Sequence, residues 1–325
     1  MTATAINPAM QELLGFAKDG NFKLKLTPRH AIVAPPGYVL ASVDFSNQEM
    51  YIGAVLSQDQ VMLNAFSAPL TISIESKEYP NPDTDLHTLT TVNCCFPSLF
   101  EGVPKHLWVA TAKDESLITM KGSPRDFAKR TNFGILYLAT AKTLAETNHV
   151  KESAAQTWID LHTKTYHGFH NWAEEIAAIV TARGWIQNSV GRWRWCAEDN
   201  AKAAGASPAR SGVNFMIQGL AADMSKLACI KVSRALSGSK AKILALIHDE
   251  IIALVPGRCS LNVEKTLAKI KKVNGEFLIP VFDADEEATY WGNVVKQCME
   301  EAESELFDWR YPGKAECSIS PYWNH

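Results

Sequence analysis

Apolar runs predict strands in two distant parts of the chain. Residues 243–247 and 251–255 are apolar and β-prone, and they flank the polar sequence His248-Asp249-Glu250. This pattern predicts two strands joined by a tight turn. Residues 38–43 are a further run typical of a buried strand, and it ends on Asp44. Both parts of the chain therefore place a carboxylate where a strand ends.

Helical patterns cover most of the remaining sequence. The Ser-Pro pairs at 123–124 and 207–208 predict helix starts, because serine caps a helix and proline suits the first helical position. Gly184 predicts a helix end. The pattern predicts helices over 8–17, 123–137, 151–183, 207–236, 262–272 and 291–307, one that ends near 56, short strands over 22–26 and 279–283, a hairpin over 185–195, a loop over 202–206 and irregular chain after 307.

Composition narrows the class of protein. The chain has 325 residues, 46% hydrophobic and 21% charged, as in a soluble globular protein of two or three lobes. A net charge of −3 means that any contact with nucleic acid depends on local clusters. Seven cysteines without a CxxC pair argue against a disulfide framework or a zinc site and fit a reducing cytosol. Without a signal peptide or a membrane-length apolar run, we expect a cytoplasmic protein with no membrane partner.

The carboxylates at the strand ends allow two interpretations. Asp249 and Glu250 on a rigid turn repel each other unless a cation lies between them. Turn residues are also often acidic for purely local reasons, and Asp44 could simply cap the helix that follows it. The residues alone leave both interpretations open.

Two helices carry polar stripes at four-residue spacing. Arg125, Lys129, Phe133 and Tyr137 follow one another along the first, where two cations and two rings near a helix N-terminus suit an anionic ligand with a flat ring. A solvated basic turn followed by a core stripe explains the same pattern equally well. Arg210, Asn214 and Gln218 share one face of the later helix and can hydrogen-bond to base edges. Residues 191–195, Gly-Arg-Trp-Arg-Trp, predict a basic and aromatic hairpin that could contact a phosphate backbone.

In order and spacing, these segments resemble family A DNA polymerases of the bacterial DNA polymerase I type. The resemblance covers about residues 29–291. Its main motifs are Asp44-Phe45-Ser46-Asn47-Gln48-Glu49, the helix that carries Arg125 to Tyr137, and His248-Asp249-Glu250; the lesser ones are Asp85-Leu86-His87, Gly191-Arg192-Trp193-Arg194 and Arg210…Asn214…Gln218-Gly219…Ala221-Ala222-Asp223. Each motif alone is weak, whereas the six in order are specific.

The resemblance implies an α+β fold. It implies an antiparallel palm sheet and a mostly helical inserted fingers subdomain, with palm over 1–61 and 204–325 and fingers over 62–203. The thumb and exonuclease domains of the family are expected to be absent. A second protein that supplies a thumb or an exonuclease is the expected partner, as in a split polymerase of a phage or a mobile replicon.

The implied reaction is addition of deoxynucleotides to the 3′ end of a primer on template DNA. Asp44 and Asp249, with the backbone of Phe45, would bind two Mg²⁺ ions, with Mn²⁺ as an alternative, and Glu250 would assist. Lys129 would donate a proton to pyrophosphate. The residues implied for the nucleotide are Glu49, His87, Arg125, Lys129, Phe133 and Tyr137, and those for DNA are Arg192, Arg194, Arg210, Asn214, Gln218 and His248.

The sequence departs from the family pattern at four positions. Asn47 and Gln48 replace Gln and Ile, Tyr51 replaces an Arg, and Leu138 replaces a Gly. None of these changes removes an expected catalytic group. Two rival functions remain at this stage: a single-subunit RNA polymerase, which Glu49 and Phe133 disfavour, and a catalytically idle DNA-binding scaffold subunit.

Overall fold

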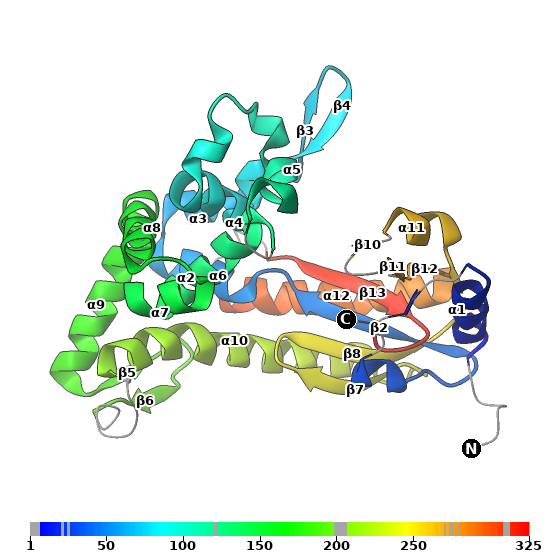
Figure 1. Ribbon diagram of the computed structural model, residues 1–325. Helices are drawn as coiled ribbons and strands as arrows, with labels where there is room; N and C mark the ends of the chain where they lie inside the picture. The colour runs from blue at the N-terminus through cyan, green and yellow to red at the C-terminus, as the bar shows by residue number, and fades with distance from the viewer. Residues whose placement is uncertain are drawn as a thin grey trace. The chain divides into compact units, whose positions relative to one another are not determined.

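The computed structural model of the chain consists of two compact units (Figure 1). Unit 1 comprises residues 1–46, 222–306 and 313–325, and unit 2 comprises residues 47–221 and 307–312. The structure describes residues 7–20, 23–24, 27–119, 122–197, 207–269, 271–272, 276–278, 280–307 and 313–324. The loop expected over 202–206 and the outer residues of the strand expected over 22–26 lie outside the described residues.

Unit 1 is built on a four-stranded antiparallel sheet. Its order is β13 (Ala315–Ser320), β2 (Tyr38–Phe45), β8 (Glu250–Pro256) and β7 (Lys242–Ile247). The three strands expected from the apolar runs are all present, and β7 and β8 are joined by a tight turn at residues 248–249. The expectation of irregular chain after residue 307 is wrong, because β13 forms the edge of this sheet next to β2.

Helix α12 (Glu286–Leu306) covers one face of the sheet. Gly292 of this helix lies close to Cys317 and Ile319, and a side chain at this position would collide with them. Cys317 and Ile319 pair with Val43 and Ala41. Because side chains alternate between the two faces of a strand, the odd-numbered residues of β2 form the face under α12.

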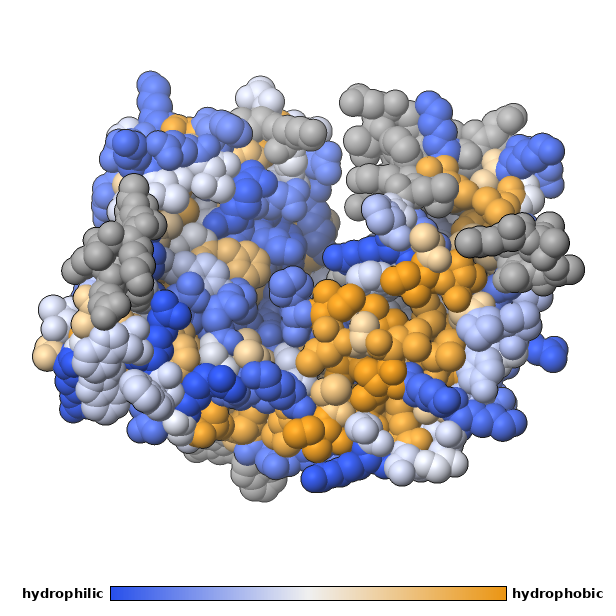
Figure 2. All heavy atoms as spheres, turned by 90° about the horizontal axis from the view of Figure 1, so that it is seen from below, coloured by the Kyte–Doolittle hydropathy of each residue, from blue (hydrophilic) through white to orange (hydrophobic). Residues whose placement is uncertain are grey.

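The opposite face carries the even-numbered residues of β2. Leu40 and Ile252 pack there with Trp323, which the chain brings back after β13. Ser42, Asp44 and Glu250 continue this face toward the β7–β8 turn. From β7, Ala245 and Ile247 pack on this face. Leu246 pairs with Ile251, so Leu244 and Leu246, which are 49% and 38% exposed, lie on the other face. Figure 2 shows an apolar surface in the region of β7 and β8.

The other elements of unit 1 are short, apart from α1. They are α1 (Pro8–Asp19), β1 (Lys23–Leu24), β9 (Cys259–Leu261), α11 (Val263–Ala268), β10 (Lys271–Lys272), β11 (Glu276–Leu278) and β12 (Phe282–Ala284). The helix expected over 262–272 is therefore shorter than predicted and gives way to a strand. The late strand expected over 279–283 is β12, which starts at Phe282; residues 280–281 are not part of a strand, and residue 279 lies outside the described residues.

Unit 2 is mainly helical. Its helices are α2 (Gln48–Ser57), α3 (Gln60–Ser67), α4 (Leu86–Thr90), α5 (Trp108–Ala112), α6 (Pro124–Leu136), α7 (Ala141–Asn148), α8 (Glu152–Thr165), α9 (His167–Arg183) and the first part of α10 (Pro208–Ala235), with hairpins β3 (Thr71–Ile74) with β4 (Lys77–Pro80) and β5 (Trp185–Gln187) with β6 (Trp193–Trp195). Tyr51, Tyr166 and Phe169 are the largest side chains of its core that are almost fully buried. The helix expected over 151–183 is two helices, which break at Tyr166.

Asp59 joins the N-termini of two helices in unit 2. One carboxylate oxygen accepts from the backbone N–H groups of Val61 and Met62, so Asp59 caps α3. The other oxygen accepts from Gly168 at 2.9 Å and Phe169 at 3.3 Å, in the first turn of α9. Gly168 approaches so closely that a Cβ atom there would lie 2.9 Å from the backbone of Asp59. One buried carboxylate thus satisfies donors of both helices.

None of the helices within the described ranges combines the length and apolar character needed to cross a bilayer.

We predict a graded loss of stability at Asp59. Loss of a helix cap costs about 0.5–2 kcal/mol, so Asp59→Ala, which removes two caps, should lower the free energy of unfolding by about 1–4 kcal/mol. Asp59→Asn keeps one accepting oxygen and should lose roughly half of that. Urea unfolding of the three proteins measures this order. Equal effects of the two substitutions would contradict the double-cap interpretation.

A second prediction concerns Glu303 on α12, which is 1% exposed. Among the described residues its Oε2 has no hydrogen-bond partner, and burial, with the nearby carboxylate of Glu300, raises its pKa from 4.5 to about 8. The folded state therefore binds a proton that the unfolded state releases between these two pKa values. This stabilisation is complete below the unfolded pKa and is lost as the pH rises through about 8.

Glu303→Gln carries no titrating proton and should flatten the decline of stability on the alkaline side. Urea midpoints taken from about pH 5 to about pH 9 measure this slope. Glu287→Gln, an exposed position of the same helix, is the matched control and should leave the slope unchanged. A slope that Glu303→Gln does not alter would assign the pH dependence to another group.

Candidate active site

The acidic residues singled out in the sequence lie on neighbouring strands of unit 1. The antiparallel register of β2 and β8 places Asp44 directly opposite Glu250. On the other side of β2, β13 places Glu316 opposite Asp44. Three acidic residues thus form one row across three strands. Like charges directly opposite each other destabilise a sheet, so this row needs a cation or compensating hydrogen bonds.

Glu250 receives such hydrogen bonds. Its side chain is buried at 3% exposure, and its Oε1 accepts from the Ser42 hydroxyl and from the Trp323 indole N–H at 2.8 Å. Ser42 lies two residues before Asp44 on the same face of β2. The Glu250 carboxylate therefore holds together two strands and the end of the chain, which suits a positioning role more than a ligand role.

Asp249 occupies the turn between β7 and β8. His248, the first turn residue, is exposed and has φ of +56°, in the left-handed region that favours glycine, asparagine, aspartate and histidine. The carbonyl of Asp249 accepts from the backbone N–H of Phe45 at 3.4 Å. This bond and the β2–β8 register bring Asp249 next to the end of β2, where Asp44 lies.

These residues fit Mg²⁺ or Mn²⁺. Asp44, Asp249 and the carbonyl of Phe45 offer only oxygen donors, and Mg²⁺ binds through one or two carboxylates together with water and substrate phosphates. Across the described parts of the chain, no three His, Cys, Asp or Glu side chains are grouped so that they could hold a metal by themselves. Such a donor set suits a cation that binds together with its substrate.

The positively charged end of α6 lies in unit 2. Ser123 and Asp126 form a reciprocal capping box at its start. Arg125 makes a bidentate ion pair with Asp85, with N–O distances of 2.7 and 2.9 Å. Burial alone would raise the pKa of Asp85, but Arg125 and the Thr88 hydroxyl bring that pKa below its ordinary value. Arg125 therefore already has an anionic partner.

His87 is buried beside this ion pair at 2% exposure. Burial and the charge of Arg125 lower its pKa to about 4, so the ring is neutral at neutral pH. Asn132 accepts from the Thr90 hydroxyl through its amide oxygen, so its amide nitrogen donates to Nδ1 of His87 at 2.9 Å. The proton of the neutral ring therefore lies on Nε2, which has no hydrogen-bond partner among the described residues.

Lys129 and Phe133 continue the stripe of α6. Lys129 is exposed, and its Nζ lies 6.0 Å from the centre of the Phe133 ring. The Phe133 ring lies 5.9 Å from the imidazole of His87. The next residue, Gly134, packs against Leu144 so tightly that any side chain there would collide with it. The cationic and aromatic residues of the stripe therefore lie next to the neutral histidine.

Glu49, Gln218 and Tyr137 form a hydrogen-bonded group. The amide nitrogen of Gln218 donates to Oε1 of Glu49 at 2.5 Å and lies 2.6 Å from the Tyr137 hydroxyl. Burial and the carboxylate of Glu49 raise the pKa of Tyr137, so its hydroxyl stays protonated. Tyr137 itself follows the last residue of α6. Residues from three distant parts of the sequence thus meet at one point of unit 2.

Leu138 replaces the family's usual glycine, and it has φ of +52°. The guanidinium of Arg210 donates to its carbonyl oxygen at 2.9 Å, which helps to hold this unfavourable conformation. Asn214 is half-buried on the same stripe of α10. Arg192 and Arg194 are exposed on the β5–β6 hairpin. The structure thus brings Gln218 to the Glu49 group, while Arg210 contacts the end of α6.

Several residues of these groups were not predicted from the sequence. Glu316 belongs to the acidic row of unit 1, Ser42 and Trp323 donate hydrogen bonds to Glu250, and Asn132 fixes the ring of His87. The alternation of side chains along β2 could have identified Ser42, because it shares a face with Asp44. Nothing in the local sequence distinguishes Trp323 or Asn132.

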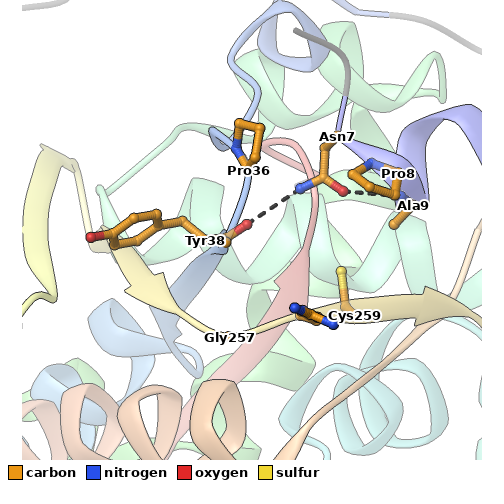
Figure 3. Close-up of a pocket in the computed structure, with 9 residues that line it drawn as sticks. Asn7, Pro8, Ala9, Pro36, Tyr38, Gly257 and Cys259 are labelled. Atoms are coloured by element: carbon orange, nitrogen blue, oxygen red, sulfur yellow. Dashed lines mark hydrogen bonds between the residues drawn. The ribbon is translucent and has the colours of Figure 1, made fainter. Parts of the chain in front are cut away.

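A separate cavity of about 320 Å³ lies in unit 1, between the start of α1 and the turns before β2 and after β8 (Figure 3). The amide nitrogen of Asn7 donates to the carbonyl of Tyr38 at 3.3 Å and closes one wall. None of the candidate site residues lines this cavity. The residues that line it are Asn7, Pro8, Ala9, Pro36, Gly37, Tyr38, Gly257, Arg258 and Cys259.

Comparison with known proteins identifies the family. The sequence profile of "DNA polymerase family A" matches residues 4–325. The chain therefore belongs to DNA polymerase family A, as the motifs and their order indicated. The fold agrees: the POL domain of Pol1 from M. smegmatis, in a complex with DNA primer-template and dNTP, superposes with a TM-score of 0.65 over 94% of this chain and 44% of that one, at 21% identity.

Two relatives illustrate the extent of the similarity. DNA polymerase I of Pseudomonas aeruginosa is 30% identical over 228 residues, which are 69% of this chain and 22% of that protein. The DNA polymerase of Mycobacterium phage D29 is 28% identical over 230 residues, which are 71% of this chain and 31% of that protein. The chain thus matches less than a third of the length of each relative.

We predict that the indole N–H of Trp323 stabilises unit 1 through Glu250. Trp323→Phe keeps an aromatic ring but removes this donor, which should cost about 1–3 kcal/mol of unfolding free energy because a buried carboxylate loses a hydrogen bond. In a Glu250→Leu background the same substitution should cost clearly less. Urea unfolding of the four proteins tests this coupling. An equal cost in both backgrounds would show that packing of the ring, and not the hydrogen bond, is responsible.

Proposed function

We propose that the chain is a template-directed DNA polymerase that adds deoxynucleotides to the 3′ end of a primer. The observation that carries this proposal is the β2–β8 register, which brings Asp44 beside Asp249 at one end of the sheet. Membership of family A and the primer-template and dNTP in the M. smegmatis complex support the choice of substrates.

In this proposal, Asp44, Asp249 and the carbonyl of Phe45 hold two Mg²⁺ ions, and Mn²⁺ can replace them. When bound, such a pair lowers the pKa of the primer hydroxyl and stabilises the attacking and leaving oxygens. The primer 3′ oxygen forms a bond to the α-phosphorus, and the bond to the leaving pyrophosphate breaks. Glu250 keeps the two strands in register through Ser42 and Trp323, so we assign it a positioning role.

Unit 2 supplies the groups for the triphosphate. Lys129, together with the start of α6, provides positive charge, and Arg125 can exchange Asp85 for a phosphate. His87 can donate its Nε2 proton as a hydrogen bond, but with a pKa of about 4 it is not charged at neutral pH. Lys129 is therefore our choice of proton donor to the departing pyrophosphate.

The remaining predicted residues would recognise the sugar, the base and the duplex. Phe133 would stack on the incoming nucleotide. Glu49 and Tyr137, which Gln218 joins, would close the space that a 2′-hydroxyl requires and so exclude ribonucleotides. Arg210, Asn214 and Gln218, with Arg192, Arg194 and His248, are proposed to contact DNA.

The domain assignment and the partner remain predictions. We expect a palm over residues 1–61 and 204–325 and fingers over 62–203, while the compact units divide at 46/47 and 221/222. A second protein that supplies a thumb or an exonuclease is proposed as a partner. Copurification from the native lysate tests for this partner. The partner proposal would be contradicted if the chain were recovered only by itself and extended primers well without any added protein.

We predict that Asp249→Asn abolishes primer extension. The substitution keeps the size of the side chain but removes a charge needed for the divalent ions, so extension should fall by roughly a thousandfold or more, as when a main electrostatic contributor is lost. Binding of primer-template should change little. Extension of a labelled primer with Mg²⁺ and dNTPs measures the activity, and fluorescence anisotropy measures the binding of primer-template.

Asp283→Asn is the matched control, because Asp283 is an exposed carboxylate of unit 1 that pairs with Lys265. It should extend primers like the parent. Full activity of Asp249→Asn would remove Asp249 from the mechanism. No incorporation by the parent, with candidate partners added, would favour the idle scaffold, and preferential use of ribonucleotides would favour an RNA polymerase.

A further inference from the structure

The β5–β6 hairpin of unit 2 exposes an aromatic face. Trp185 pairs with Trp195, and Gln187 pairs with Trp193, so these four side chains share one face of the hairpin. Trp193 is 64% exposed and Trp195 is 53% exposed. On the other face, Ile186 is buried in the core of the unit at 5% exposure. The hairpin is thus anchored on one side and presents tryptophan rings on the other.

Fold stability does not explain this exposure. A tryptophan buries a large apolar area when it packs, and exposed pairs of large aromatic residues commonly mark a binding surface. Gly184 ends α9 with φ of +76° and lets the chain enter β5 directly. In the turn, the backbone N–H of Asn188 donates to the carbonyl of Arg192 at 2.8 Å, and the backbone N–H of Arg192 donates to Oδ1 of Asn188 at 2.9 Å. The hairpin that carries the tryptophan rings is therefore held in place by Gly184 and by the hydrogen bonds of its turn.

The charge around the rings favours an anionic ligand. The hairpin itself, residues 185–195, contains two arginines, Arg192 and Arg194, and no acidic residue; Arg183 precedes it by two positions, and Glu198 and Asp199 follow in the sequence. The guanidinium of Arg183 lies 5.9 Å from the centre of the Trp185 ring. Flat rings interleaved with positive charge are the combination that binds single-stranded nucleic acid, where bases stack on aromatic side chains and phosphates lie near cations.

The spacing of the rings selects unpaired bases. Trp193 and Trp195 are two residues apart on one strand, which separates their Cα atoms by about 6.6 Å. Successive bases in duplex DNA are only about 3.4 Å apart along each strand. Two neighbouring bases can therefore stack on both rings only if they are unstacked from each other, as in an extended single strand.

We propose that this tryptophan face binds unpaired nucleotides of single-stranded DNA by stacking. The choice of DNA rests on the proposed polymerase function, in which the template ahead of the primer end is single-stranded. The inference goes beyond the phosphate contact expected for Arg192 and Arg194, because it assigns the bases to Trp193 and Trp195.

The test is binding of a fluorescein-labelled oligothymidylate, without metal ions or dNTPs, followed by anisotropy. Each stacked ring contributes about 1–3 kcal/mol per base, so Trp193→Ala should weaken binding by about 5-fold to about 150-fold, and Trp193→Ala with Trp195→Ala should weaken it further. Trp193→Phe with Trp195→Phe keeps two rings and should remain within a few-fold of the parent. Binding of a blunt duplex should not change in any of these variants.

Tyr290→Ala is the matched control, because this exposed aromatic residue of α12 is 60% exposed and lies in unit 1. It should bind the oligonucleotide like the parent. Since both tryptophans are exposed, thermal unfolding should show unchanged midpoints for the alanine variants; if the double variant unfolds, the single variant and the phenylalanine pair still decide the question.

The proposal is overturned if the alanine variants bind the oligonucleotide within about twofold of the parent, where about fivefold is the least expected loss. It is also overturned if they lose equal affinity for the duplex, or if the parent self-associates in sedimentation experiments and the alanine variants do not. Asp249→Asn should bind the oligonucleotide normally. Failure of primer extension with intact, tryptophan-dependent binding would therefore contradict the polymerase proposal alone.

Discussion

The candidate catalytic centre depends on the pairing of β2 with β8. A shift of one residue in this register would turn Asp44 to the face under α12 and would separate Glu250 from Ser42. The register is fixed on both faces: apolar side chains pack beneath α12 on one, and Leu40 and Ile252 pack with Trp323 on the other. Burial of these side chains thus determines where the acidic residues lie.

The cost of placing acidic residues side by side is met in different ways. Glu250 is buried and receives hydrogen bonds from Ser42 and Trp323. Asp249 lies in the turn between β7 and β8 and is only half-buried. In unit 2, the buried His87 avoids the cost of a buried charge by remaining neutral. Hydrogen bonds thus compensate the burial of Glu250 in unit 1, and neutrality of the ring compensates the burial of His87 in unit 2.

The sequence predicted the parts of the structure that have strong local patterns. β2, β7 and β8 follow from apolar runs, and α6 and α10 follow from their Ser-Pro starts. The break at Tyr166 was not predicted, because apolar periodicity continues through it without a proline or a glycine at the break. β13 was missed because a six-residue edge strand with Glu316 and two serines has a weak pattern. The hydrogen bond from Trp323 to Glu250 was not predicted, because no local sequence pattern links residues so far apart.

In the proposed function, the ion pair between Arg125 and Asp85 affects which anions unit 2 would bind. An incoming anion can bind Arg125 only by replacing the two hydrogen bonds that Arg125 makes to Asp85. Asp85 would then keep only its bonds to the start of α4. A small, weakly charged ion such as free phosphate has few additional contacts with which to compete. A longer polyanion can reach Lys129 at the same time, and the sum of its contacts can exceed this threshold. In the proposed function, the carboxylate of Asp85 would thus compete with the ligand for Arg125 and would favour a long, highly charged anion over a small one.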